Sequence, residues 1–245
     1  MSEPPAAADF GQQLGQALAA PTSPPSWWML LVMIGVGVAL TLPGSRLRQM
    51  NLVGLIVHEA GHALVALISG GRVEKIALAD TQAGETTTIR RVGMPSVATT
   101  FAGYAAPPLA GLGVAALLAN GKAPLVNGFG VLLAVLVLLV SRDLITIALV
   151  LAFGSSMALV LWFAPPPVQV WLASGLLGLL LTHSAVRVAQ LTVEWFRTEP
   201  GSRPEGNDAI SLYQETGVTP YFWLLLWALL LGVCWWMALS WLMFS

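Results

Sequence analysis

Residues 52–68 form an apolar run that carries His58, Glu59 and His62 in its middle. Such a run favours a helix inside a membrane, where an ionisable side chain costs about 2.5–3.5 kcal/mol at the bilayer centre and usually marks a functional site. Residues four apart lie on one face of a helix, so His58 and His62 can present imidazole nitrogens to one cation. Glu59 lies about 100° round the helix from His58, within reach of a water on that cation without ligating it. The run therefore predicts a metal site in a membrane helix.

The spacing is that of the H-E-x-x-H motif of zinc peptidases, in which the glutamate is the general base. A structural alternative is two histidines hydrogen-bonded to neighbouring helices, with Glu59 paired to an arginine. The cost of three ionisable groups in one membrane helix favours the metal site. Gly61 removes side-chain bulk inside the motif, so another helix or a substrate backbone can approach closely. Because Cys234 is the single cysteine, histidine and carboxylate must hold any metal.

The rest of the chain has the composition of a membrane protein. Of its 245 residues 56% are hydrophobic and 9% charged, whereas soluble domains carry about 25% charged residues. The net charge of −1 gives no reason to expect nucleic-acid binding. We expect an all-α polytopic protein with about six to seven transmembrane helices, surrounded by the lipid bilayer. The expected spans are 27–42, 52–68, 97–119, 123–140, 144–164, 168–182 and 221–244.

The chain divides into an N-terminal tail and one membrane domain. Residues 1–25 contain no lysine or arginine, which argues against a secretory signal, and their Ala, Gln and Pro content favours a disordered tail. Residues 26–245 are expected to form a single integral membrane domain. Within it, Pro107 and Pro108 lie inside the third span and interrupt its backbone hydrogen bonds, which a membrane helix tolerates only where protein or a cavity shields the freed groups. His183, at the end of the sixth span, is interpreted as an ordinary interfacial histidine.

Two polar segments interrupt the spans. In residues 72–92, threonines and β-branched residues flank a turn that contains Gly84, which favours a β-hairpin over a plain linker. Residues 187–219 are interpreted as a polar loop. Eight lysines and arginines lie on the side of these two segments and three on the other side. The positive-inside rule therefore predicts that the hairpin and the loop are cytoplasmic.

The motif and its surroundings resemble the site-2 protease family of intramembrane zinc metallopeptidases. A late segment resembles a compact bacterial branch of that family. The resemblance implies Zn²⁺ as cofactor, membrane-protein substrates, a bacterial plasma membrane, and an active site towards the cytoplasmic side. The family's second signature, an Asn-Pro-x-x-x-Leu-Asp-Gly type segment, is absent from this chain. The residues that carry the resemblance are 57–63, 70–73, Asn207, Asp208, Ala209, Leu212, Thr216, Gly217 and Trp223.

Two carboxylates are candidates for the third metal ligand. Asp208 lies in the segment that resembles the compact branch, but it is also a good N-cap for a helix beginning near Ala209. Asp143 lies at the cytoplasmic end of the fourth span, where the family's order of elements implies a ligand. Beside Arg142, however, it also suits a simple interfacial cap. On the resemblance, we favour His58, His62 and Asp208 as the ligand set.

The sequence thus predicts a zinc-dependent endopeptidase that cleaves membrane-spanning substrates, with Glu59 as general base on zinc-bound water. A helical substrate must unwind first, and an edge strand of the 72–92 hairpin is expected to hold the unwound segment by strand addition. The alternative is a non-proteolytic membrane protein, a metal transporter or an assembly factor, that keeps a structural metal site. A transporter would show ionisable residues in several spans or a repeat, and the other spans are nearly free of them.

Overall fold

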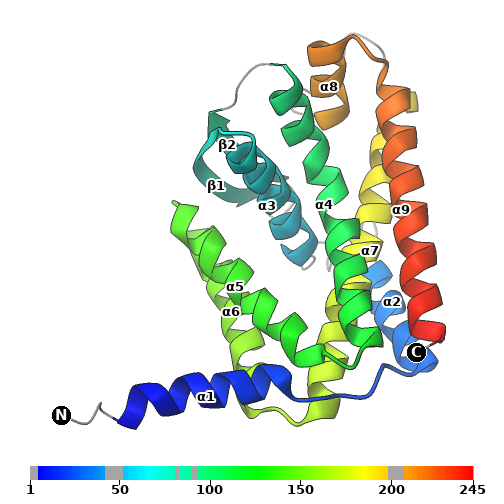
Figure 1. The fold of residues 1–245 in the computed structure, drawn as a ribbon. Coiled ribbons are helices and arrows are strands. Elements are labelled where there is room, and N and C mark those ends of the chain that lie inside the picture. The colour runs from blue at the N-terminus through cyan, green and yellow to red at the C-terminus, as the bar shows by residue number, and fades with distance from the viewer. Residues whose placement is uncertain (1–4, 42–51, 81–82, 90–92, 198–206, 245) are drawn as a thin grey trace.

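The computed structural model describes residues 5–41, 52–80, 83–89, 93–197 and 207–244, which form a helical bundle with one two-stranded sheet (Figure 1). The elements are α1 (Pro5–Ala19), α2 (Trp27–Thr41), α3 (Leu52–Ile68), β1 (Arg72–Asp80), β2 (Ala83–Ile89), α4 (Met94–Ala119), α5 (Ala123–Val140), α6 (Leu144–Phe163), α7 (Pro166–Arg197), α8 (Asp208–Thr216) and α9 (Pro220–Met243).

Each of the seven expected spans contains a helix. Five of these helices are long and apolar enough to cross a membrane, namely α4, α5, α6, α7 and α9. Helices α2 and α3 are apolar but shorter, with 15 and 17 residues. At 1.5 Å per residue, α3 is about 25 Å long, less than the hydrocarbon thickness of about 30 Å. The all-α polytopic membrane fold is confirmed.

Helix α4 lies at the centre of the bundle and packs against α3, α7 and α9. Helix α2 packs against α7 so closely that a Cβ atom added at Gly37 would lie 2.7 Å from the Gly178 carbonyl oxygen. Small residues allow this approach, as in many membrane helix pairs. One continuous core joins α2, α3, α4, α5, α7 and α9, with Leu118 and Ala173 fully buried in it.

Pro107 and Pro108 lie inside α4, as predicted for the third span, and the helix continues through both residues. Each proline removes one backbone donor from the helix, but both side chains are buried in the bundle. Neighbouring helices can satisfy the freed backbone groups of a membrane helix, so a proline pair does not have to end it.

The predicted β-hairpin is confirmed. Strands β1 and β2 are antiparallel, with Ile76 opposite Thr86, and β1 also forms an isolated parallel bridge from Ile76 to Ser141. Ile76 is buried in a cluster with residues of α3, α5 and α6. The hairpin therefore lies against α3 and against the junction of α5 and α6 (Figure 1).

Helix α7 is longer than the predicted sixth span, and part of the predicted 187–219 loop is helical. The helix ends at Arg197, and α8 occupies Asp208–Thr216. Val188 and Leu191 are buried in a second cluster that contains residues of α4, α8 and α9, and this packing extends the helix past its apolar part. His183 is also buried, with its ring against Gly54 of α3, so the interfacial interpretation is wrong.

The N-terminal segment contains a helix where the composition favoured a disordered tail. Helix α1 contacts α5 and α6, with Phe10 stacked on Trp162 at a ring-centroid distance of 5.4 Å. Leu18 lies against Gly128, and the backbone N–H of Thr22 donates to the Gly121 carbonyl at 2.9 Å. Alanine, glutamine and leucine are good helix formers, and these contacts give them a surface to pack on.

Candidate metal centre

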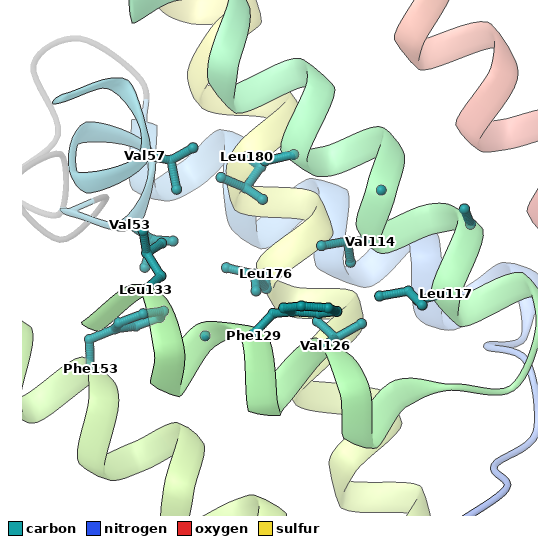
Figure 2. A pocket seen from close by; sticks show the side chains of 14 residues that line it. Val53, Val57, Val114, Leu117, Val126, Phe129, Leu133, Phe153, Leu176 and Leu180 are labelled. Carbon is teal, nitrogen blue, oxygen red and sulfur yellow. The ribbon is translucent and has the colours of Figure 1, made fainter. Parts of the chain in front are cut away.

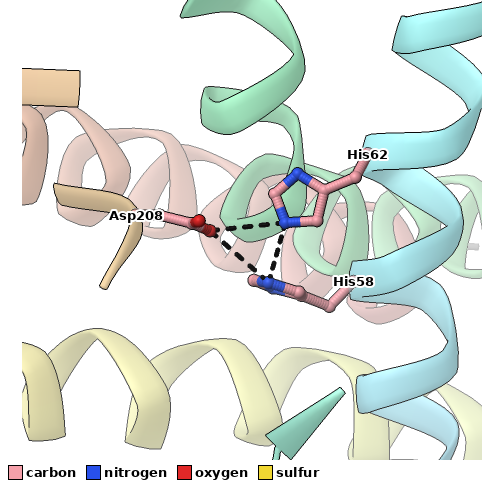
Figure 3. A group of neighbouring side chains, drawn as sticks. All are labelled: His58, His62 and Asp208. Atoms are coloured by element: carbon pink, nitrogen blue, oxygen red, sulfur yellow. Dashed lines mark hydrogen bonds and ion pairs between the residues drawn. The ribbon is translucent and has the colours of Figure 1, made fainter. Parts of the chain in front are cut away.

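Helix α3 presents its two histidines together on one face. The Nε2 atoms of His58 and His62 lie 3.1 Å apart, with the two rings nearly perpendicular at 83°. This is the arrangement that the four-residue spacing predicted, and it leaves both Nε2 atoms directed at one point beside the helix (Figure 3).

Asp208, the first residue of α8, completes a group of three ligand atoms. Its Oδ2 atom lies 3.5 Å from His58 Nε2 and 3.4 Å from His62 Nε2 (Figure 3). Among the described residues, these three side chains form the group with ligand atoms close enough to hold one metal ion. Asn207 fills the N-cap role considered for Asp208, since its Oδ1 accepts from the Ala209 N–H at 2.9 Å. Asp208 is therefore available to the histidines.

The separations fit a tetrahedral zinc site. Zinc bonds to nitrogen and oxygen of about 2.0–2.1 Å place tetrahedral ligand atoms about 3.3–3.4 Å apart. The three separations here, 3.1, 3.4 and 3.5 Å, bracket that value. Within the described part of the chain, the Oδ2 atom of Asp208 is buried without a hydrogen-bond partner, as expected of an atom that faces a cation. The donor set therefore fits zinc.

The ionisation of Asp208 suits the same role. Burial alone raises the pKa of this carboxyl, but its close polar contacts and charge interactions with His58 and His62 outweigh burial and hold the pKa well below its usual value. The carboxylate is therefore ionised at neutral pH, which is the form that binds a metal.

Helix α4 orients the histidines from the other side. The Nδ1 atom of His62 donates to the Thr99 carbonyl at 2.7 Å, which leaves Nε2 as the lone-pair donor of that ring. Tyr104 lies edge-on against His58, with a ring-centroid distance of 4.7 Å. Gly61 of the motif faces Ala102 and Ala106, and its missing side chain brings α3 and α4 together. Both rings are thereby held in place before any metal arrives.

Gly103 leaves the space that the two imidazoles occupy. A Cβ atom added there would lie 2.3 Å from His62 Nε2 and 2.8 Å from His58 Cε1. We expect Gly103→Ala to displace both rings and to weaken zinc binding by about 10–100-fold, the effect typical of disturbing the surroundings of metal ligands.

Zinc competition titration of the purified protein measures this effect. The matched control is Gly113→Ala in the same helix, where an added Cβ meets nothing within 4 Å. Equal zinc affinity in both variants would contradict the assignment of Gly103 to the site.

Glu59 is 3% exposed and is held by the hairpin. The Thr86 hydroxyl of β2 donates to Glu59 Oε2 at 2.5 Å. Glu59 is adjacent to His58 in α3 and lies outside the group formed by His58, His62 and Asp208.

Asp143, the other candidate ligand, caps a helix instead. Its Oδ1 atom accepts from the Thr146 N–H at 2.8 Å, at the N-terminus of α6. This hydrogen bond is the main cause that lowers the pKa of the Asp143 carboxyl. Asp143 is not in the group formed by His58, His62 and Asp208.

An apolar cavity of about 450 Å³ lies near the other end of α3 (Figure 2). It is bordered by α3, α4, α5, α6 and α7, and the three clustered ligands are not among its lining residues. The labelled lining residues are Val53, Val57, Val114, Leu117, Val126, Phe129, Leu133, Phe153, Leu176 and Leu180. With no ionisable side chain, it offers no group for acid–base chemistry or metal binding.

Sequence reasoning missed three residues around the centre: Thr99, Thr86 and Gly103. Thr99 acts through its backbone carbonyl, which any residue type would supply. Thr86 was assigned only to the hairpin. Gly103 carries the clearest missed signal, because a glycine among small residues in a membrane helix marks a close approach.

Comparison with known proteins gives one family match. A family model described as Peptidase M50B-like matches residues 30–238, which include α3, the hairpin and α8. No curated protein and no solved structure was found to match the chain.

Proposed function

The chain belongs to the Peptidase M50B-like family, a site-2 protease family, and from that premise we propose that it is an intramembrane zinc metalloprotease. The observation that carries the proposal is the group of His58, His62 and Asp208, whose ligand atoms lie within 4.8 Å of one another beside a buried glutamate. The five helices long and apolar enough to span a membrane, together with the family, make it an integral membrane protein whose substrates lie in the bilayer.

In this proposal the two histidines and Asp208 hold the metal, and Glu59 is the general base. Zinc held by these residues would act as a Lewis acid, lowering the pKa of a water molecule and polarising the scissile carbonyl. Glu59 accepts the proton of that water and later delivers it to the leaving amine. Burial of Glu59 in an apolar bundle excludes bulk water that would compete for its carboxylate.

The hairpin gives the substrate a place to bind. Strand β1 is flanked by β2 and by the Ser141 bridge, whereas β2 pairs only with β1 among the described residues. The outer edge of β2 is therefore the edge that can accept an unwound substrate segment by strand addition.

The test uses the full-length protein in lipid vesicles with a membrane-spanning model peptide. We expect about one zinc per chain, cleavage of the peptide, loss of cleavage on chelation, and recovery when zinc is added back. Bound zinc without cleavage of membrane peptides would favour a non-proteolytic protein with a structural metal site.

We further propose a bacterial plasma-membrane location with the active site towards the cytoplasm. The hairpin and α8 lie at the same end of the bundle, while α1 and the turn after α4 lie at the other (Figure 1). Eight of the lysines and arginines lie in segments on the hairpin side of the predicted spans and three on the other side. The positive-inside rule therefore assigns the hairpin side to the cytoplasm.

Cysteine labelling in intact cells tests this orientation. In a Cys234→Ser background, Glu74→Cys in β1 is expected to resist an impermeant thiol reagent added outside, whereas Asn120→Cys is expected to react. Both positions are exposed in the structure, so accessibility alone does not separate them. Labelling of Glu74→Cys from outside would reverse the assignment.

A further inference from the structure

We propose that Thr86 is a positioning residue that holds the general base Glu59 in its working orientation, an inference that rests on the proposed proteolytic function. It gives the β-hairpin a second task beside substrate binding, because the residue that orients the base lies on the same strand that would receive the substrate.

The hydrogen bond between the two residues identifies the donor and the acceptor. The Thr86 Oγ1 atom lies 2.5 Å from Glu59 Oε2 and 3.3 Å from the Glu59 carbonyl oxygen. A hydroxyl has one hydrogen to donate, and the shorter contact to the charged oxygen receives it. The second carboxylate oxygen, Oε1, is then left to accept a proton.

The fold keeps Thr86 in this position. Ile76 is directly opposite Thr86 in the sheet, and paired residues project from the same face. Ile76 is 1% exposed in a cluster with Ile56 and Ala63 of α3 and Val137 of α5. Ile76 is packed into the bundle, and Thr86 projects from the same face of the hairpin. Thr86 is therefore directed at α3, where it contacts Glu59.

A glutamate without this partner would be free to turn. Its side chain has three rotatable bonds, and the position of the carboxylate relative to the metal ligands depends on all of them. Productive proton transfer requires hydrogen-bonding reach of about 2.6–3.2 Å. A donor on a rigid hairpin removes the alternative orientations, as supporting residues do in other active sites.

The experiment compares Thr86→Val, which keeps the shape and removes the donor, with Thr86→Ser, which keeps the donor. We expect Thr86→Val to lower kcat by about 10–100-fold, the range for residues that support a metal site, with zinc content and KM near those of the parent. Thr86→Ser is expected to restore most of kcat.

Peptide affinity provides a readout that does not depend on turnover. Binding of the model peptide is measured in Glu59→Gln protein with and without Thr86→Val. A positioning role leaves this affinity unchanged. If Thr86 only docks the hairpin for substrate binding, Thr86→Val weakens peptide binding and raises KM instead, and the inference is overturned.

The remaining outcomes separate this inference from the proposed function. Full kcat in Thr86→Val, with Glu59→Gln inactive, would refute the positioning role and leave the proteolytic function intact. Ordinary cleavage by Glu59→Gln would refute both. If Thr86→Val does not fold, Thr86→Ser and Thr86→Ala are compared instead. Higher kcat in Thr86→Ser than in Thr86→Ala supports the positioning role, and equal kcat in the two variants contradicts it.

Discussion

Replacement of Glu59 by glutamine is expected to abolish cleavage of a membrane peptide while zinc stays bound. General acid–base catalysis contributes about 10²–10⁴-fold in rate, and an amide cannot accept the proton that the carboxylate accepts. The change preserves the size of the side chain and an oxygen that can accept the Thr86 hydrogen bond. Zinc is retained because Glu59 is not one of the three clustered ligands. Parallel measurement of turnover and zinc content tests both statements.

His58→Ala is the matched comparison, since it removes a proposed ligand one residue away. It is expected to lose zinc and cleavage together. The difference between the two variants separates proton transfer from metal binding. Ordinary turnover by Glu59→Gln would contradict the mechanism, and zinc loss in Glu59→Gln would show that the glutamate supports the metal more directly than its place outside the ligand group implies.

Helix α3 and its pair of histidines could be predicted from sequence because the information for them is local. His58 and His62 are four residues apart, and the helical repeat alone brings their ring nitrogens together. The hairpin was equally local, since its strands and turn are adjacent in the chain. The seven apolar segments followed from hydropathy, which reports a property of each segment by itself.

The errors arose where packing between distant segments decides the structure. Residues 187–197 were interpreted as a loop because they are polar, and the burial of Val188 and Leu191 against α4, α8 and α9 shows that α7 continues through them. His183 has polar neighbours in sequence, yet it lies buried against Gly54 of α3.

The third ligand shows the same limit most clearly. Spacing within the sequence could not distinguish Asp208 from Asp143, because each carboxylate also suits a helix cap. In the structure the N-cap residue of α6 is Asp143, and the N-cap residue of α8 is Asn207 rather than Asp208. This assignment of caps leaves Asp208 free to face His58 and His62.

Asp208→Asn is therefore expected to lose most of the bound zinc, whereas Asp143→Ala is expected to keep it. The asparagine has the size of aspartate but no charge, so it lacks the anionic oxygen that lies 3.4 Å from His62 Nε2. Asp143→Ala removes only an N-cap and is expected to lower the free energy of unfolding by about 1 kcal/mol. Zinc per chain after dialysis against a weak chelator, with thermal unfolding in detergent, measures both effects.

The pair of variants discriminates among three ligand sets, because each set predicts a different pattern. Zinc loss in Asp208→Asn alone agrees with the set of His58, His62 and Asp208. Loss in Asp143→Ala alone would transfer the third position to Asp143 and require α6 to approach α3 differently from the structure. Retention in both would leave two histidines with solvent oxygens as the remaining ligands.

Asn207→Ala serves as the local control, since it removes the N-cap of α8 without removing a proposed ligand. A large zinc loss in this variant would mean that the placement of α8, more than the Asp208 charge, determines zinc binding.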